Sequence, residues 1–249
     1  MLVNNIKSFS CSKAGNSPEE NEDRFVLPHT DLGGSLIRMA VADGATESSF
    51  SKEWAELLVE HYATSSDFDT HFFPTIFPTI RKTWLERINY DNLEWYAQQK
   101  LEMGAFASFL GATIDLSTGE MNATAVGDSN LFVFRDCEMQ NTFPILNAEG
   151  FGNTPFLISS ELQKNLTSEP FFSLQTIQLL PDDILILGTD AISRWILQEI
   201  EHKNYPINQL IDLLNHESGP ITFQTWLDEK REIGNIKNDD TTIILIQMT

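Results

Sequence analysis

Cysteine is scarce in this chain of 249 residues, which has only Cys11 and Cys137, far apart in the sequence. Two such cysteines give no disulfide framework, so the sequence favours a reducing compartment, and we expect both thiols to be buried as small apolar side chains. Residues 1–15 lack the apolar core of a secretory signal, and no apolar run reaches the ~18 residues that span a bilayer. We therefore expect a cytoplasmic protein that is not a membrane protein.

Basic residues are also few. The chain has 16 Lys and Arg against 36 Asp and Glu, which gives a formal net charge of −20. This excess of negative charge argues against nucleic acid or an anionic membrane as a partner. It fits a solvated acidic surface, and it fits equally a protein that binds cations at an acidic site. The hydrophobic share of 41% is ordinary and is sufficient for a sizeable core.

No repeat, low-complexity tract or linker divides the chain, so we expect one domain over residues 1–249 that acts as a monomer. Apolar patterns predict strands at 37–43, 109–115, 120–126, 131–134 and 241–247, and a hairpin formed by 173–179 and 183–189. Helical spacing predicts helices after an N-cap at Ser51, over 79–99 with a break near 89–92, and at 191–201, 206–215 and 221–232.

These elements are typical of an α+β fold. Closely spaced strands with short turns imply antiparallel pairing. Two antiparallel sheets stacked face to face, with helices on the outsides, would bury the apolar strands on both faces. The helical stripe that includes Trp84, Ile88 and Tyr96 is expected in the core, and the irregular residues 141–170 are expected to form a flap beside the functional site.

Four short acidic segments are the most informative feature of the sequence, and three of them touch an apolar, strand-like run. The segments are Asn21-Glu22-Asp23, Ala42-Asp43-Gly44, Gly188-Thr189-Asp190 and Asn238-Asp239-Asp240. Carboxylates at strand ends lie at the edge of a buried sheet, where isolated charges are costly unless they are neutralised. If several converge, they form the cluster of oxygen ligands that Mg²⁺ and Mn²⁺ prefer. A pair of bound metal ions is the leading hypothesis.

Each segment alone has an ordinary structural explanation. Asp43-Gly44 is a common turn dipeptide, and Asp190 could simply cap the helix that starts at Ala191. Asp239 and Asp240 could be only a polar turn before the last strand, and Glu22 and Asp23 only a solvated start to a strand. Their order along the chain is what favours the metal site.

In that order, the chain resembles the PP2C-type (PPM) metal-dependent Ser/Thr protein phosphatases over about residues 5–248. The resemblance rests on Asn21-Glu22-Asp23, Val41-Ala42-Asp43-Gly44, Gly111-Ala112-Thr113, Val126-Gly127-Asp128-Ser129, Gly188-Thr189-Asp190-Ala191 and Asp239-Asp240-Thr241-Thr242. It implies a PP2C-like four-layer α-β-β-α sandwich with two central antiparallel sheets. It also implies a bacterial stand-alone hydrolase for phosphoserine and phosphothreonine in proteins, which opposes a Ser/Thr kinase.

The resemblance also implies a role for each acidic residue. Asp43 would bridge two Mn²⁺ or Mg²⁺ ions, and Gly44 would offer its backbone carbonyl to one of them. Asp190 and Asp239 would complete the coordination, and a hydroxide that bridges the two ions would attack phosphorus. The residues assigned to hold metal-bound waters are Glu22 and Asp23.

Two further acidic residues have weaker assignments. Asp240 replaces the usual Asn of the family and is placed behind the ligands, although Asp239 and Asp240 could exchange roles. Asp128 is interpreted as structural, with a carboxylate that satisfies buried backbone donors.

Three departures from the family pattern affect substrate binding and the number of ions. Residues 15–20 contain no Arg to bind phosphate, and Lys13 is the nearest cation. Ala45 and Thr46 stand where many eukaryotic members have a His. Residues 106–110 offer no acidic ligand for a third ion. A non-catalytic regulatory or binding module with the same fold is therefore the alternative hypothesis.

Overall fold

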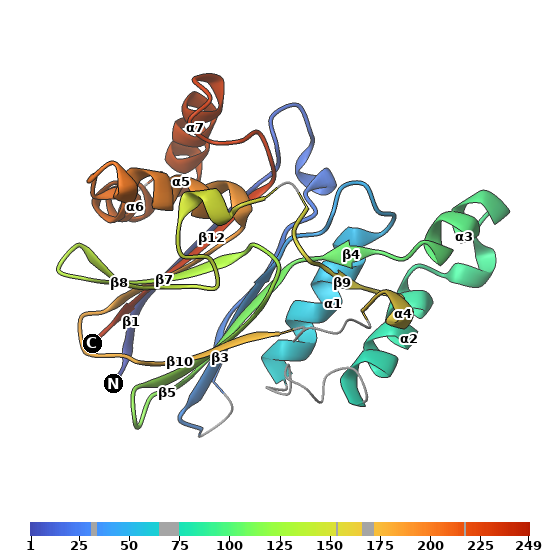
Figure 1. Ribbon diagram of the computed structural model, residues 1–249, viewed down its shortest axis with the longest axis horizontal. Helices are drawn as coiled ribbons and strands as arrows, with labels where there is room; N and C mark the ends of the chain where they lie inside the picture. Colours follow the sequence, from blue (N-terminus) through green and yellow to red (C-terminus); the bar gives the residue numbers. More distant parts are fainter. Residues whose placement is uncertain (31–33, 65–74, 153, 166–171, 217) are drawn as a thin grey trace.

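The computed structural model describes the chain except for residues 31–33, 65–74, 153, 166–171 and 217. The described elements form four layers, with two sheets in the middle and helices outside each (Figure 1). The α+β sandwich of antiparallel sheets expected from the sequence is confirmed.

The strands of each sheet pair antiparallel throughout. The first sheet has the order β1-β12-β11-β7-β8, with β1 (Val3–Cys11), β7 (Asn130–Arg135), β8 (Glu138–Phe143), β11 (Ile184–Gly188) and β12 (Thr241–Met248). The second has the order β10-β6-β5-β3-β2, with β2 (Arg24–Thr30), β3 (Leu36–Ala42), β5 (Phe109–Asp115), β6 (Glu120–Val126) and β10 (Ser173–Gln178). A short ladder joins β4 (Phe106–Ala107) to β9 (Ile158–Ser159).

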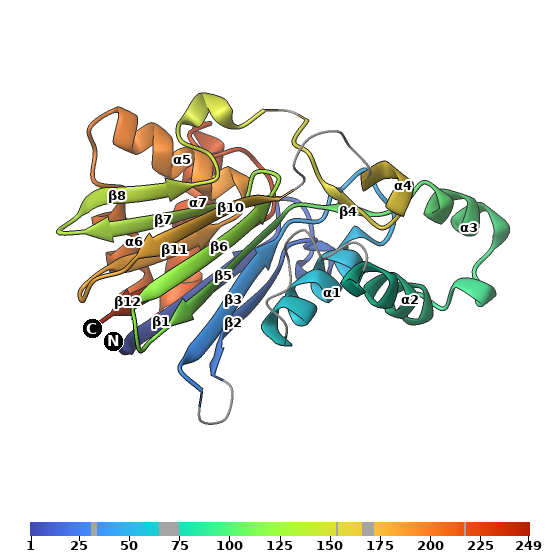
Figure 2. The same ribbon diagram turned by 60° about the horizontal axis from the view of Figure 1, so that its bottom comes forward.

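Two groups of helices cover the outer faces of the sheets (Figure 2). The first sheet is covered by α5 (Asp190–Glu201), α6 (Pro206–Asn215) and α7 (Gly219–Glu232), and the second by α1 (Ser51–Thr64) and α2 (Phe77–Arg87). A 3-10 turn (Tyr90–Asn92) separates α2 from α3 (Trp95–Glu102), as the predicted break requires. The short α4 (Leu162–Asn165) follows β9.

Strand alternation divides the apolar side chains among three cores. In β12, Ile244 and Ile246 face the other sheet, whereas Ile243 and Leu245 pack beneath the helices. This is the period of two expected when both faces of a sheet are covered. The three fully buried tryptophans, Trp54, Trp84 and Trp195, all lie in the two helix-covered cores.

Close contact between α1 and β5 requires glycine at position 111. A Cβ atom built on Gly111 would lie 2.5 Å from the ring of Tyr62, closer than real Cβ contacts. Tyr62 is 2% exposed, and its hydroxyl is hydrogen-bonded to the Thr113 hydroxyl at 3.0 Å. The Tyr62 ring therefore packs α1 directly against β5.

Two predicted strand connections are wrong. The expected hairpin 173–189 does not form, because β10 pairs with β6 in one sheet and β11 pairs with β7 and β12 in the other. Likewise β6 and β7 are consecutive but belong to different sheets. Both connections carry the chain between the layers. At the first, the buried carboxylate of Asp183 accepts hydrogen bonds from the Arg135 guanidinium at 2.7 and 3.0 Å.

Several burial predictions also need correction. Tyr96 is exposed rather than part of the core, because α3 lies at the edge of the helical layer. Cys137 is exposed and Cys11 is only partly buried, so neither behaves as a fully buried thiol. Among the described helices, none is long and apolar enough to cross a bilayer.

We expect Gly111→Ala to destabilise the fold by about 1–3 kcal/mol, the usual cost of an overpacked core. The added methyl group must displace the Tyr62 ring, which is buried. Chemical denaturation of both proteins measures the difference. Gly152→Ala is the matched control, because a Cβ there would meet nothing closer than 4.0 Å. An equal effect of the two substitutions would contradict the packing argument.

Candidate active site

The acidic segments lie at strand ends that come from both sheets. Asp43 directly follows β3, and Asp190 begins α5 just after β11. Asp239 precedes β12, whose first residues pair with the end of β11, since Gly188 lies opposite Ile243. The topology therefore brings carboxylates from distant parts of the chain to one end of the sandwich.

The pocket where they meet, here called the acidic pocket, has a volume of about 460 Å³. The aspartates in its lining are Asp43, Asp128, Asp190 and Asp239. The remaining lining comes from the turn after β3, from the stretch predicted as a flap and from one lysine: Gly44, Ala45, Thr46, Glu47, Gly152, Thr154, Pro155, Leu157 and Lys237. Part of residues 141–170 thus borders the site, although this stretch also contributes β9 and α4, and its residues 153 and 166–170 lie outside the described residues.

Asp23 and Glu22 stand behind the acidic pocket and are not among its lining residues. Asp23 is 2% exposed, and one of its oxygens accepts a hydrogen bond from the Thr189 hydroxyl at 3.0 Å. Its other oxygen, Oδ1, has no hydrogen-bond partner. Glu22 accepts a hydrogen bond from the Ser51 hydroxyl at 2.5 Å. Ser51 is the first residue of α1, and its hydroxyl donates to Glu22 instead of capping the helix, so the predicted N-cap role is wrong.

The geometry separates Asp239 from Asp240. Both oxygens of Asp240 accept backbone N–H groups, from Lys13 at 2.8 Å and from Glu22 at 2.7 Å. Asp240 therefore ties the segments before α1 to the start of β12, and only Asp239 lines the pocket. The nearly buried guanidinium of Arg231 donates to the Asp239 carbonyl at 2.5 Å and to the Ser12 carbonyl at 3.1 Å. This contact holds the Asp239 backbone in place.

Burial and mutual repulsion raise the pKa values of the clustered carboxyls. Burial, and then the charges of neighbouring aspartates, raises the pKa of Asp43 well above its ordinary value. Burial is also the main cause that raises the pKa of Asp23 to about 8 and that of Asp128 to about 7. Asp128, interpreted from sequence as structural, thus lies in the pocket wall with the other carboxylates. Such a cluster binds cations because a cation removes the repulsion.

Lys237 supplies the positive charge in the pocket, and the sequence reasoning missed it. Its ammonium group lies 2.5 Å from Asp239 Oδ2 and 3.3 Å from Asp190 Oδ2. These partners outweigh the effect of burial and raise the pKa of Lys237 above its ordinary value. The only sequence signal was a lysine two positions before a candidate ligand.

The oxygen atoms of the pocket are of the kind that bind a divalent cation. In this structure, however, Asp190 and Asp239 are paired with Lys237. The Oδ1 atoms of Asp23 and Asp190 are buried without a hydrogen-bond partner, as expected for oxygens that await a cation. Over the described parts of the chain, no three His, Cys, Asp or Glu side chains are already placed to hold a metal ion. A metal ion would therefore require these side chains to move.

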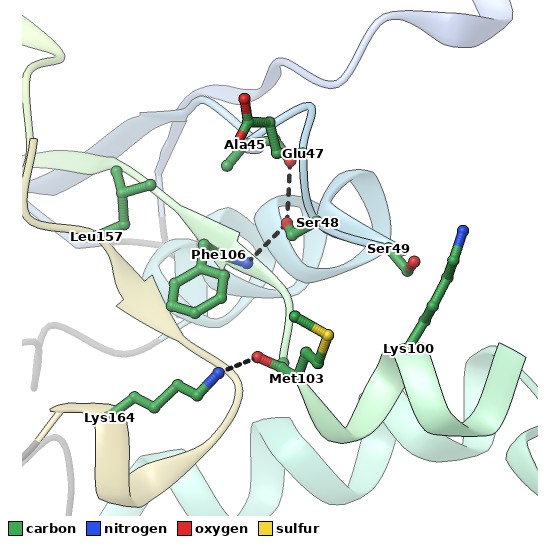
Figure 3. A pocket seen from close by; sticks show the side chains of 10 residues that line it. Ala45, Glu47, Ser48, Ser49, Lys100, Met103, Phe106, Leu157 and Lys164 are labelled. Carbon is green, nitrogen blue, oxygen red and sulfur yellow. Dashed lines mark hydrogen bonds between the residues drawn. The ribbon is translucent and has the colours of Figure 1, made fainter. Parts of the chain in front are cut away.

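A second pocket, of about 630 Å³, adjoins the acidic pocket, and Ala45, Glu47 and Leu157 line both. Figure 3 shows the side chains of Met103, Phe106 and Leu157 around it, with the Lys164 ammonium turned to the Met103 carbonyl. This ammonium also lies 5.1 Å from the centre of the Phe106 ring. The pocket is a mainly apolar surface next to the carboxylates.

Comparison with known proteins agrees with this geometry. Residues 14–229 match the family model described as protein phosphatase 2C, and the chain belongs to that family. None of the curated proteins compared with the chain matches it.

Solved structures show the same fold at low sequence identity. The photosystem II phosphatase PBCP has a TM-score of 0.60 and 16% identity, with 98% of each chain covered. The catalytic domain of the serine/threonine phosphatase PstP, in complex with 2 manganese ions, has a TM-score of 0.57 and 14% identity, with 100% of each chain covered. The S. agalactiae serine/threonine phosphatase has a TM-score of 0.58 and 13% identity, with 98% of this chain and 100% of that one covered.

Without divalent ions, we expect the melting temperature to fall as pH rises from about 5.5 to about 8.5. The folded chain keeps protons on Asp23 and Asp128 to pH values near 8 and 7, whereas the unfolded chain releases them near 3.8. The stability that these groups contribute is full below the unfolded pKa and is lost as pH rises through the folded values. Thermal melts in EDTA measure the slope. Asp23→Asn should flatten it, and an unchanged slope in that variant would count against the assignment.

Proposed function

We propose that the chain is a metal-dependent phosphatase that hydrolyses phosphoserine and phosphothreonine in proteins. The observation that carries this proposal is the convergence of Asp43, Asp190 and Asp239 in one pocket of a protein phosphatase 2C family member. The buried oxygens without partners support it, because they give a cation a place to bind. The lack of a disulfide framework fits a cytoplasmic enzyme, and a phosphatase of this kind would oppose a Ser/Thr kinase.

In this proposal, Asp43 would help to hold the two Mn²⁺ or Mg²⁺ ions. Asp190, Asp239 and the backbone carbonyl of Gly44 complete the direct ligands, and Glu22 and Asp23 stand behind them. When bound, such ions would supply positive charge for the phosphoryl oxygens and lower the pKa of a water molecule that attacks phosphorus.

The residues of the chain provide the rigid frame for that chemistry. Arg231 and Asp240 hold the backbone before β12, so Asp239 is presented at a fixed place. The Thr189 hydroxyl donates a hydrogen bond to Asp23 and so orients its carboxylate. The hydroxyl oxygen of Thr189 also accepts the Thr242 N–H at 2.9 Å, which fixes the start of β12 to the end of β11. Ligands held this way do not need to reorganise during the reaction.

The apolar pocket beside the carboxylates suits the polypeptide around a phosphorylated residue. A phosphoryl group at the acidic pocket would leave the flanking residues of the substrate over Met103, Phe106 and Leu157. A small aryl phosphate lacks these flanking residues. Protein substrates should therefore gain binding energy there that small esters do not.

A non-catalytic binding module is the second candidate, favoured by two observations. Lys237 already pairs with two of the proposed ligands. Residues 15–20 contain no Arg, and the nearest cation, Lys13, donates to the Thr46 hydroxyl at 3.1 Å. Hydrolysis measured with Mn²⁺ and with EDTA separates an enzyme from such a module.

We expect Asp43→Asn to lower metal-dependent hydrolysis of an aryl phosphate by more than about 100-fold, since even partners behind metal ligands are worth about 10–100-fold. The amide removes the negative charge that the two ions would share. Steady-state rates with Mn²⁺ measure the loss, and a thermal melt checks folding. The control is Asp182→Asn in the exposed connection after β10, where the positive φ of 68° suits Asn. Full activity in Asp43→Asn would refute the proposed site.

Met103→Ala should lower kcat/KM for a phosphothreonine peptide by about tenfold and leave an aryl phosphate unaffected. Met103 is 66% exposed, so its truncation removes substrate contact without opening a cavity in the core. Leu146→Ala is the control, because Leu146 is 71% exposed and lines neither pocket. Equal losses on both substrates would argue against a peptide-binding role.

A further inference from the structure

We propose that Lys237 is a built-in competitor of the metal ions: its ammonium group pairs with Asp190 and Asp239 in the metal-free protein and leaves them when a divalent ion binds. This inference rests on the proposed function, because it takes these aspartates as metal ligands. It adds a residue of this chain that sets how tightly metal binds.

The contacts place the ammonium group on two of the carboxylates that a metal would use. It lies 2.5 Å from Asp239 Oδ2 and 3.3 Å from Asp190 Oδ2, so one cation bridges two carboxylates that come from different segments. An ion coordinated by those two carboxylates would lie close to the ammonium group, and the two positive charges would repel each other. Binding of either cation therefore weakens binding of the other.

Lysine neutralises the cluster only in part. The pair leaves Asp190 Oδ1 without a hydrogen-bond partner, and Asp43 and Asp128 line the same pocket. A single positive charge thus faces four aspartates and Glu47 in the pocket lining. Two divalent ions bring more charge and accept more oxygen ligands than one ammonium group. Metal should therefore win the competition at a sufficient concentration.

The side chain of Lys237 can leave without disturbing the fold. Its side chain is 56% exposed, so the ammonium group can turn into solvent and keep its hydration. Its backbone is fixed, because the preceding Ile236 is 2% exposed in the core under α5 and α7. The Lys237 carbonyl also accepts the Asp239 N–H at 3.0 Å. The structure thus has a fixed backbone and a lysine side chain that can turn away.

Lys237→Met tests the proposal, since it keeps the length of the side chain and removes the charge. We expect this variant to bind Mn²⁺ about tenfold more tightly in a calorimetric titration, within the usual range for coupled sites. In EDTA it should melt at a lower temperature than the parent chain, because the aspartates lose their counter-charge. Lys237→Arg, which retains the charge, should resemble the parent. Lys82→Met changes a lysine with a 78% exposed side chain on α2 and should alter neither property.

Two results would overturn the proposal. Unchanged or weaker Mn²⁺ binding by Lys237→Met, with a higher KM for aryl phosphate, would mean that Lys237 holds substrate phosphate. Absence of Mn²⁺ binding in both proteins would remove the competition altogether. Binding only in Lys237→Met would be the strongest support. The titration does not depend on turnover, so a parent chain that binds Mn²⁺ but hydrolyses nothing would refute the phosphatase assignment and leave the competition intact.

Discussion

Repulsion among aspartates at the strand ends is the constraint on which the rest of the site depends. The pocket gathers carboxylates whose negative charges raise one another's pKa values, and burial strengthens the effect. The surrounding contacts oppose this repulsion. Both oxygens of Asp240 accept backbone N–H groups, and Arg231 donates to the carbonyl of Asp239. Lys237 supplies a positive charge. These contacts hold the site together against the repulsion between its aspartates. The positive charge of Lys237 offsets part of that repulsion.

Much of the fold followed from local patterns, because strand alternation and helical spacing depend on nearby residues. The sheet to which a strand belongs depends instead on residues that are distant in the sequence. Residues 173–189 have the spacing of a hairpin, yet β10 pairs with β6 and β11 joins the other sheet. The buried Asp183, paired with Arg135, stabilises this crossing. That pair spans 48 positions of the sequence, so no local window could have predicted it.

The candidate site was predictable for a different reason. The order of the acidic motifs along the chain selected Asp43, Asp190 and Asp239, and the structure places all three in one pocket, although their role as metal ligands stays a prediction. Lys237 and the position of Asp128 were missed. A lysine in a polar stretch suggests a solvated side chain, and its partner Asp190 is 47 positions away. What Lys237 faces across such a distance depends on the pairing of β11 with β12, which single residues do not reveal.

The division of the pocket between the two sheets has a consequence for how the protein assembles. Asp43 belongs to the end of β3 in one layer, whereas Asp190 and Asp239 flank β11 and β12 in the other. Neither layer alone carries the full set of carboxylates. A folding intermediate with only one sheet formed would have no complete cation site, so ion affinity reports on whether the halves have docked. A small slide of one layer over the other would likewise change the spacing of the carboxylates. The packing between the two sheets thus sets the distances between the carboxylates of the site.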